Sequence, residues 1–468
     1  MLIVKWMVWC VAIVAPTVTA AQTSTWDYSD HTLENGLRVI TLEDHSTPVA
    51  AVQVWYHVGS KDENPQRQGF AHMFEHMMFR GTDRIGEMDH FKYLRKYGGT
   101  VNGYTTWDST VYIQDVPANQ LDLTFWLEAE RMANLTINEE FFAKEREVVK
   151  EEFRLRVADP PYGQLFPLIF DFAFTTHPYR WTPIGNLDHL NAATAEELRQ
   201  FFDTYYVPNN ATLVVVGDVR HEDVLAKAKK FFGWIPRAAT PPRVTVQEPV
   251  MTEARRFEFT EQKGPVPIVA LGYHVCPDGH PDSYALKVLE QIVAGGESAR
   301  ANKRLVKERE MFVGAGAGSM FLEQAGIFGM GGAVKPGVGL EDAEEAVVAE
   351  IKDLVANGVT DQELQKARNN LVAQSVRQRA RVSGKAQRLG YAAVVLGDID
   401  IVNRELDLLM KVSTEDVHNV AKKYFKPERQ LTLVVTPVIY KLNPFRGLFG
   451  GKKSAEKKPA EDKKEEKE

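Results

Sequence analysis

The chain has 468 residues, of which 44% are hydrophobic, and this is enough for two to four domains with apolar cores of their own. Its formal net charge at pH 7 is −7, so it lacks the excess of basic residues that nucleic-acid-binding proteins use to contact phosphates. We therefore expect no nucleic-acid partner.

Residues 1–21 are predicted to be a secretory signal peptide. The apolar run from Trp6 to Pro16 is too short to cross a bilayer comfortably, and the small residues of Val18–Ala21 provide a cleavage site. We therefore expect a secreted, periplasmic protein with no membrane span in its mature form. Cys10 would leave with the signal peptide, so Cys276 alone would remain and no internal disulfide is expected.

The first half, residues 25–234, shows strand patterns followed by a run of helix patterns. Strands are expected at His31–Glu43, with Asn35-Gly36 as a turn signal, at Val49–Val58, as a pair within Thr100–Val116, and at Ala211–Val219. Helices are expected at Gly69–Arg80, Glu87–Tyr97, Ala118–Ala133, Asn138–Val157, Tyr162–Ala173, Ala193–Tyr206 and Glu222–Phe232.

The second half repeats the first. Tyr56-His57-Val58 recurs as Tyr273-His274-Val275, and the segment Thr194–Val215 recurs as Thr414–Val435, about 220 residues later. This offset indicates a domain duplication. The predicted fold class is α+β, with two homologous domains that each have a mostly antiparallel sheet and helices packed on one face. The predicted segments are a signal peptide (1–21), an N-terminal domain (25–234), a Pro-rich linker (235–250), a C-terminal domain (251–445) and a charged disordered tail (446–468).

One helix combines an apolar sequence with three chemically active side chains. Between Phe70 and Phe79 every side chain is apolar except His72, Glu75 and His76. At about 100° per residue, these three leave the helix on one face. Two imidazoles at i and i+4 beside a carboxylate form a zinc half-site, and His-x-x-Glu-His is the inverted zincin motif.

A catalytic zinc site needs a third protein ligand. The helix that begins after Asn138 places Glu145 and Glu152, seven residues apart, on its apolar face, whereas Glu151 falls on the opposite, charged face. Periodicity alone does not decide which of the two inward carboxylates would bind a metal. The alternative is that both pair with Arg or Tyr side chains in the interior.

These features together resemble the pitrilysin and insulysin family of zinc peptidases, which includes the mitochondrial processing peptidase. The family shares the His-x-x-Glu-His motif, a Glu about 76 residues later, which Glu152 matches relative to His76, and a helix signature that Glu145–Val149 supplies. The segment Gly98–Tyr112 resembles the family's Gly-Gly and Asn-x-x-Thr strand. The resemblance covers both halves, roughly from Thr25 to Tyr440.

The resemblance implies one Zn²⁺ per chain, bound by His72, His76 and Glu152. Glu75 would be the general base that takes the proton of a zinc-bound water as it attacks a peptide carbonyl, and would then protonate the leaving amine. Glu145 would orient a ligand through a hydrogen bond. The implied activity is that of a secreted zinc metalloendopeptidase acting on peptides or unfolded polypeptide segments.

The resemblance also suggests where substrate binds. Asn102, Gly103 and Tyr104 lie on the strand that would pair with an extended substrate, main chain to main chain. The alternative for Asn102 is a plain turn residue.

The second copy departs from the family pattern. It carries Leu286 and Leu289 where the first copy carries metal-site residues. Active family members also have an Arg and, about seven residues later, a Tyr in this half. Here no Tyr follows Arg309 at that distance, and none occurs between Tyr284 and Tyr391. We therefore expect a heterodimer in which a related subunit supplies the Arg/Tyr pair.

Two alternatives remain open at this point. In the first, another residue such as Arg304 or Arg309 takes the place of the missing Arg/Tyr pair, and the chain is active without a partner.

In the second, the chain is a non-catalytic homologue that binds peptides or acts as a chaperone. The complete set of His72, Glu75, His76 and Glu152 argues against this second alternative.

Overall fold

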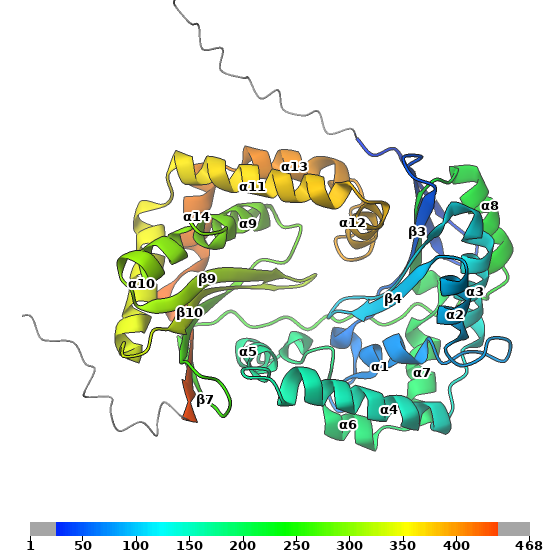
Figure 1. Cartoon of the computed structure of the whole chain (residues 1–468), viewed down its shortest axis with the longest axis horizontal. Coiled ribbons are helices and arrows are strands. Elements are labelled where there is room, and N and C mark those ends of the chain that lie inside the picture. Colours follow the sequence, from blue (N-terminus) through cyan, green and yellow to red (C-terminus); the bar gives the residue numbers. More distant parts are fainter. Residues whose placement is uncertain (1–24, 439–468) are drawn as a thin grey trace, which may run out of the picture.

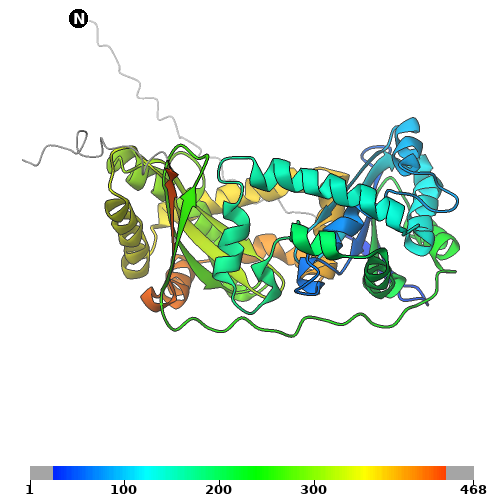
Figure 2. The same ribbon diagram turned by 90° about the horizontal axis from the view of Figure 1, so that it is seen from below.

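The computed structural model describes residues 25–438, which form two domains side by side (Figure 1). The predicted signal peptide (1–21), the whole predicted tail (446–468) and residues 439–445 of the predicted C-terminal domain lie outside the described residues. Within residues 25–438 no helix is both long and apolar enough to cross a membrane. Residues 236–252 form no helix or strand and run extended from one domain to the other (Figure 2). The exact domain and linker boundaries stay predictions.

The first domain contains six strands and eight α-helices. Its strands are β1 (Tyr28–Thr32), β2 (Arg38–Glu43), β3 (Val49–Tyr56), β4 (Thr100–Thr105), β5 (Thr110–Pro117) and β6 (Ala211–Gly217). Its helices are α1 (Phe70–Met77), α2 (Asp89–Lys96), α3 (Leu121–Asn134), α4 (Glu139–Phe153), α5 (Leu165–Ala173), α6 (Leu187–Ala192), α7 (Ala195–Tyr205) and α8 (His221–Phe232). A π-helical turn, Arg154–Ala158, follows α4 directly.

The second domain, as far as the structure describes it, contains five strands and six α-helices. The strands are β7 (Arg255–Glu261), β8 (Ile268–Val275), β9 (Phe312–Phe321), β10 (Gly326–Val334) and β11 (Leu431–Pro437). The helices are α9 (Pro281–Ala294), α10 (Leu340–Asn357), α11 (Asp361–Arg379), α12 (Val382–Val394), α13 (Ile401–Lys411) and α14 (Thr414–Tyr424), and Asn302–Glu308 forms a second π-helical turn.

The two sheets have the same topology. Their strand orders are β1-β2-β6-β3-β5-β4 and β7-β11-β8-β10-β9, so the second order repeats the first once β1 is set aside. Each sheet has one parallel pair, β2 with β6 and β7 with β11, and all other neighbours are antiparallel. The predicted α+β class with two homologous, mostly antiparallel domains is confirmed.

Each domain places one helix on the sheet of the other domain. Helix α12 of the second domain packs on β3 and β6 of the first sheet, next to β3 in Figure 1. The approach is so close that a Cβ on Gly390 would lie 2.1 Å from Trp55 Nε1, so no other residue fits there. In return, α5 of the first domain packs on the second sheet, where the rings of Phe172 and Phe257 stack with centroids 5.3 Å apart. Each sheet therefore also carries a helix of the other domain, in addition to the helices of its own domain.

Besides shifts of a few residues at several element ends, the predicted elements differ from the structure in three places. The segment His31–Glu43 is a hairpin of two short strands instead of one strand, and Gly36 in the turn has a φ of 91° that favours glycine. The helix predicted from Asn138 to Val157 changes from α to π geometry at Arg154. Helix α6 was not predicted, because its six residues are too few to show a period.

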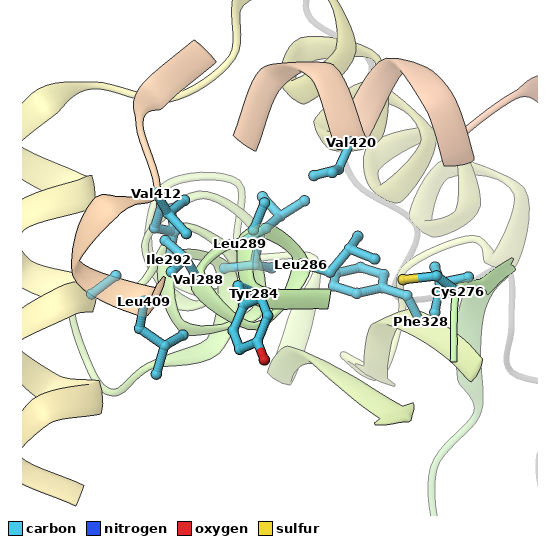
Figure 3. Packing of buried hydrophobic residues seen from close by; sticks show 14 of the residues in the cluster. Cys276, Tyr284, Leu286, Val288, Leu289, Ile292, Phe328, Leu409, Val412 and Val420 are labelled. Atoms are coloured by element: carbon cyan, nitrogen blue, oxygen red, sulfur yellow. The ribbon is translucent and has the colours of Figure 1, made fainter. Parts of the chain in front are cut away.

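In the second domain, the positions that match the metal-site residues of the first domain hold apolar side chains. Leu286 and Leu289 on α9 are fully buried in an apolar cluster that also includes Ile292 and Val420 (Figure 3). Full burial of one leucine contributes roughly 1.5–3 kcal/mol, so this helix is held by its apolar face. In the described residues each sheet ends in two edge strands, β1 and β4 in the first and β7 and β9 in the second.

The tip of the β9–β10 hairpin is anchored in the first domain. Glu323 forms ion pairs with the buried Lys61 and with His57, whose Nε2 lies 2.8 Å from Glu323 Oε2. The backbone N–H of Glu323 donates to Asp108 Oδ2 at 3.0 Å, and Lys61 Nζ lies 2.9 Å from Asp108 Oδ1. A charged cluster with little solvent exposure therefore joins the two domains at this point.

Candidate metal centre

Helix α1 is held at its N-terminus by a buried carboxylate. Glu63 accepts hydrogen bonds from the backbone N–H groups of Gly69 and Ala71, each at 2.9 Å. These N–H groups have no partner inside the helix, so the carboxylate satisfies them and fixes where the helix begins. Burial raises the pKa of Glu63 to about 8, although both backbone hydrogen bonds favour the ionised form. Gly69 precedes the helix with a φ of 97°, a conformation that favours glycine.

Helices α1 and α4 bring three ligand atoms together. His72 Nε2 and His76 Nε2 lie 3.5 Å and 3.3 Å from the same atom, Glu152 Oε2, and the three ligand atoms all lie within 4.8 Å of one another. Ligands bound at about 2.1 Å in tetrahedral geometry lie about 3.4 Å apart, so the spacing fits Zn²⁺. Two imidazoles and one carboxylate are also a donor set that zinc accepts with an open fourth position.

The two histidines have different surroundings. Burial, with the neighbouring His76, lowers the pKa of His72 to about 4. Burial also opposes charge on His76, but the hydrogen bonds to Glu145 and Glu152 outweigh it and raise the pKa of His76 to about 9. In the described part of the chain His72 Nδ1 is buried without a hydrogen-bond partner, so nothing corresponding to Glu145 holds this ring from behind.

Glu145 orients the second histidine. Its Oε2 lies 3.1 Å from His76 Nδ1, and its Oε1 accepts a charged hydrogen bond from Arg80. The carboxyl group is only 4% exposed, and burial raises its pKa, but His76 and Arg80 outweigh burial and the net shift is downward. The side chain thus stays ionised and holds the imidazole so that Nε2 faces the cluster. Glu151, by contrast, is exposed and pairs with Arg154.

Glu75 lies between the cluster and the edge strand β4. Thr105 Oγ1 donates to Glu75 Oε2 at 2.8 Å. A Cβ on Gly103 would lie 3.1 Å from Glu75 Cγ, so glycine lets the strand approach this closely. Burial raises the pKa of the Glu75 carboxyl, and the hydrogen bond from Thr105 opposes the rise. One carboxylate oxygen is therefore fixed, while no side chain in the described residues is hydrogen-bonded to the other.

The predicted substrate residues on β4 face two ways. Gly103 faces Glu75, as does Thr105, two residues along the same face. Asn102 and Tyr104 therefore lie on the opposite face, where Asn102 is exposed. Tyr104 OH accepts a hydrogen bond from Gln387 on α12, so the second domain holds this side chain. Among residues 25–438 strand β4 pairs with β5 alone, so its other edge carries no neighbouring strand.

Sequence reasoning missed three residues of this site. Thr105 could have been identified from the sequence, because it follows the predicted substrate residue Gly103 by two residues and therefore lies on the same face of the strand. Arg80 carried a weaker signal, since it follows His76 by four residues, the spacing of side chains that meet on a helix. Glu63 carried no signal, because it reaches the start of α1 from a loop whose path no local pattern reveals.

The arginines considered as substitutes for the missing pair are already engaged. Arg304 Nη1 lies 2.9 Å from Glu350 Oε2 and 2.6 Å from Asp353 Oδ2. Arg309 Nη2 lies 3.3 Å from Glu350 Oε1. Both guanidinium groups thus bind carboxylates of α10 inside the second domain.

The chain matches two family models. Residues 38–166 match the one described as Insulinase (Peptidase family M16), and residues 192–371 match Peptidase M16 inactive domain. The zinc protease PqqE from Helicobacter pylori is 32% identical over 413 residues, which cover 87% of this chain and 92% of that protein.

Solved structures show the same fold. A protease from Helicobacter pylori has a TM-score of 0.84 at 30% identity, over 88% of this chain and 100% of that chain. The periplasmic protease PqqL from Escherichia coli has a TM-score of 0.75 at 20% identity, and the match covers 93% of this chain but 51% of PqqL. Both Helicobacter pylori matches are thus named as proteases and span most of this chain. The chain belongs to peptidase family M16, as the motifs indicated.

Proposed function

We propose that this chain is a zinc metalloendopeptidase that hydrolyses peptides or unfolded polypeptide segments. The observation that carries the proposal is the meeting of His72, His76 and Glu152 at zinc-ligand spacing, with Glu75 on the same helix as the two histidines. Zinc, when bound there, supplies a Lewis acid and lowers the pKa of its water toward neutrality.

The side chains of the site divide the remaining work. His72, His76 and Glu152 would hold the metal, and Glu145 orients His76. Glu75 is the proposed general base: its free carboxylate oxygen takes the proton of the attacking water and returns it to the leaving amine. Thr105 holds the other oxygen of Glu75, so the base keeps its place during the transfer.

We propose the free edge of β4 as the substrate-binding strand. An extended peptide would add to the sheet by main-chain hydrogen bonds to the segment Asn102–Tyr104. The closeness of Gly103 to Glu75 would bring the peptide's scissile bond next to the base. The hydrogen bond from Gln387 to Tyr104 would hold β4 in place relative to the metal centre.

Two further parts of the proposal concern the whole protein. We expect a related subunit to supply the Arg/Tyr pair, and the fold neighbour PqqL, about half of which this chain matches, supports a protease built from two such units. We also expect export to the periplasm, which the predicted signal peptide and the periplasmic neighbour support.

The test measures zinc and hydrolysis in the same preparations. The purified chain should hold one Zn²⁺, and His72→Ala and Glu152→Ala should lose it, because three protein ligands are the minimum of a catalytic zinc site. Hydrolysis of unstructured peptides should disappear with the metal. A non-catalytic peptide-binding homologue would bind peptides and cleave none with its zinc in place, and this result would overturn the proposal.

A further inference from the structure

Arg156 lies beside the metal centre and has no assigned role. It stands in the π-helical turn after α4, four residues after Glu152, and its Nη1 lies 2.6 Å from Glu152 Oε1. This is the carboxylate oxygen that faces away from His72 and His76, which both contact Oε2. The guanidinium is also close enough to His72 and Glu75 for its charge to act on both.

Most of the donors of Arg156 are free. A guanidinium has five N–H groups, and Glu152 is its one ion-pair partner among residues 25–438. Its side chain is 73% exposed. Arg154, two residues earlier, is the contrasting case, because Glu151 takes its Nε and Nη2 at 2.9 Å and 2.6 Å, and Asp159 takes its Nη1. Carboxylates thus occupy both sides of the Arg154 guanidinium, whereas the Arg156 guanidinium keeps N–H groups free to bind a further carboxylate.

The simplest explanation of the contact between Arg156 and Glu152 is an ordinary surface ion pair. The argument against it is that Glu152 is also a proposed metal ligand. Arg156 does not serve the metal by its charge, since a cation beside a zinc ligand repels the zinc. An anion that arrives with the substrate would remove this repulsion and would fill the open guanidinium fork, which matches a carboxylate in shape.

The strands on which a substrate would pair offer no charged side chain to recognise a charged substrate residue. Two of the four edge strands among residues 25–438, β4 (TVNGYT) in the first sheet and its counterpart β9 (FVGAGAGSMF) in the second, carry no Asp, Glu, Lys or Arg. Strand pairing on either of them would read the main chain of a substrate and not its charge. A charged side chain near the scissile bond therefore needs a partner from outside the strands, and Arg156 is placed to be that partner.

We propose that Arg156 is a specificity-determining residue that binds a carboxylate of the substrate next to the scissile bond. The proposal rests on the peptidase function proposed above. The carboxylate comes from an acidic side chain or from the C-terminus of a short peptide, and the two sources share the same chemistry.

The test compares matched peptides on three variants of the zinc-loaded full chain. The fluorescent probes are unstructured peptides that differ by Glu or Gln beside the scissile bond, and each is made with a free or an amidated C-terminus. Peptide binding is measured in proteins that also carry Glu75→Gln, so that the result does not depend on hydrolysis. The value of kcat/KM is measured in proteins that keep Glu75. The variants are Arg156→Ala, Arg156→Glu and the matched control Arg154→Ala, with zinc content and thermal melting recorded for each.

We expect the unmodified site to favour the carboxylate peptide over its amide counterpart by about tenfold, the effect of one charged hydrogen bond. Arg156→Ala should remove this preference, Arg156→Glu should favour a Lys peptide instead, and Arg154→Ala should leave it unchanged. The arm that responds, Glu against Gln or free against amidated C-terminus, identifies the source.

Three results would overturn the proposal. These are equal binding of carboxylate and amide peptides by the parent chain, a preference that survives Arg156→Ala, and loss of zinc from Arg156→Ala, which would mean that Arg156 serves Glu152 instead. Hydrolysis without any charge preference would refute the role of Arg156 and leave the peptidase function intact. Absence of hydrolysis would refute the peptidase function, while the binding measurements would still decide the role of Arg156.

Discussion

At the scale of single residues, position on α4 separates two glutamates of similar sequence context. Glu145 is buried and contacts both His76 and Arg80, whereas Glu151 is exposed and pairs with Arg154. The first contact orients a ring that is expected to bind metal, and the second is an exposed ion pair that contributes little to stability.

We therefore predict that Glu145→Ala weakens zinc binding by roughly 10- to 100-fold, because the freed imidazole of His76 loses its orientation and its hydrogen-bond acceptor. Glu151→Ala is the matched control on the same helix and should change zinc affinity by less than about twofold. Competition with a chelator measures both. Equal losses in the two variants would contradict the orienting role of Glu145.

The role of Glu75 can be separated from that of the ligands. Glu75→Gln keeps the size of the side chain and its contact with Thr105 but removes the basic carboxylate. We predict that the variant retains zinc and loses hydrolysis by at least about 100-fold, the lower range of what a positioned general base contributes. Metal analysis and peptide hydrolysis are measured on one preparation. A Glu75→Gln protein without zinc would show that Glu75 is a ligand instead.

At the scale of elements, the approach of β4 to α1 depends on a glycine. Because a Cβ on Gly103 would lie 3.1 Å from Glu75 Cγ, Gly103→Ala should push the base by a few tenths of an ångström. We predict a fall in kcat of about 3- to 30-fold with zinc content unchanged. Gly314 on β9, an edge strand of the second sheet, is the control, because nothing lies within 4 Å of a Cβ there. A Gly103→Ala variant with unchanged kcat would contradict this account.

The sequence predicted the elements whose signal is local. Helix α1 and the inward face of α4 follow from residue spacing alone, and repeated segments indicated two homologous domains. The exchange of α5 and α12 between the domains was not predictable, because nothing local in either helix says which sheet it covers. The π-helical turn after α4 was also missed, since Arg154–Ala158 fits an α-helical pattern equally well. The roles of the site residues stay predictions until they are measured.

At the scale of the whole molecule, the β9–β10 hairpin joins the two domains through Glu323. Removing this carboxylate would leave Lys61, which is 2% exposed, with less compensation for its buried charge. We predict that Glu323→Gln lowers the free energy of unfolding by roughly 3 kcal/mol near neutral pH, a value typical of a broken buried pair. Glu310→Ala, which removes an exposed pair with Lys335, is the control and should lower the free energy of unfolding far less.

The effect of Glu323 should depend on pH. Burial raises the pKa of Glu323, but His57 and Lys61 outweigh burial and lower it from 4.5 to about 2. Because the folded pKa lies below the unfolded one, ionised Glu323 stabilises the fold above about pH 4.5, and this contribution is lost as the pH falls toward 2. Denaturation curves near neutral pH and near pH 3 should therefore show a smaller difference between parent and Glu323→Gln at the lower pH. A difference that grows on acidification would contradict the assignment.

The second domain, as far as it is described, lacks the Arg/Tyr pair that, by the family resemblance, donates to the oxyanion formed when water attacks a peptide bond. Arg304 and Arg309 are engaged with Glu350, and no Tyr occurs between Tyr284 and Tyr391. A well-placed donor contributes on the order of 10²- to 10³-fold to rate. A second copy of this chain would bring another metal centre but again no Tyr, so a homodimer would not remedy the loss.

We therefore predict that a related subunit raises the activity of the zinc-loaded chain by about 10²- to 10³-fold on unstructured peptides. This subunit should lack the His-x-x-Glu-His motif and carry an Arg and a Tyr about seven residues apart in its second half. The measurement is turnover with and without the subunit, and the control is the same subunit with its Tyr replaced by Phe, which keeps the fold and removes the donor. The Phe variant should bind the chain and fail to activate it. Full turnover by the chain alone, unchanged by the subunit, would show that the chain completes its own site.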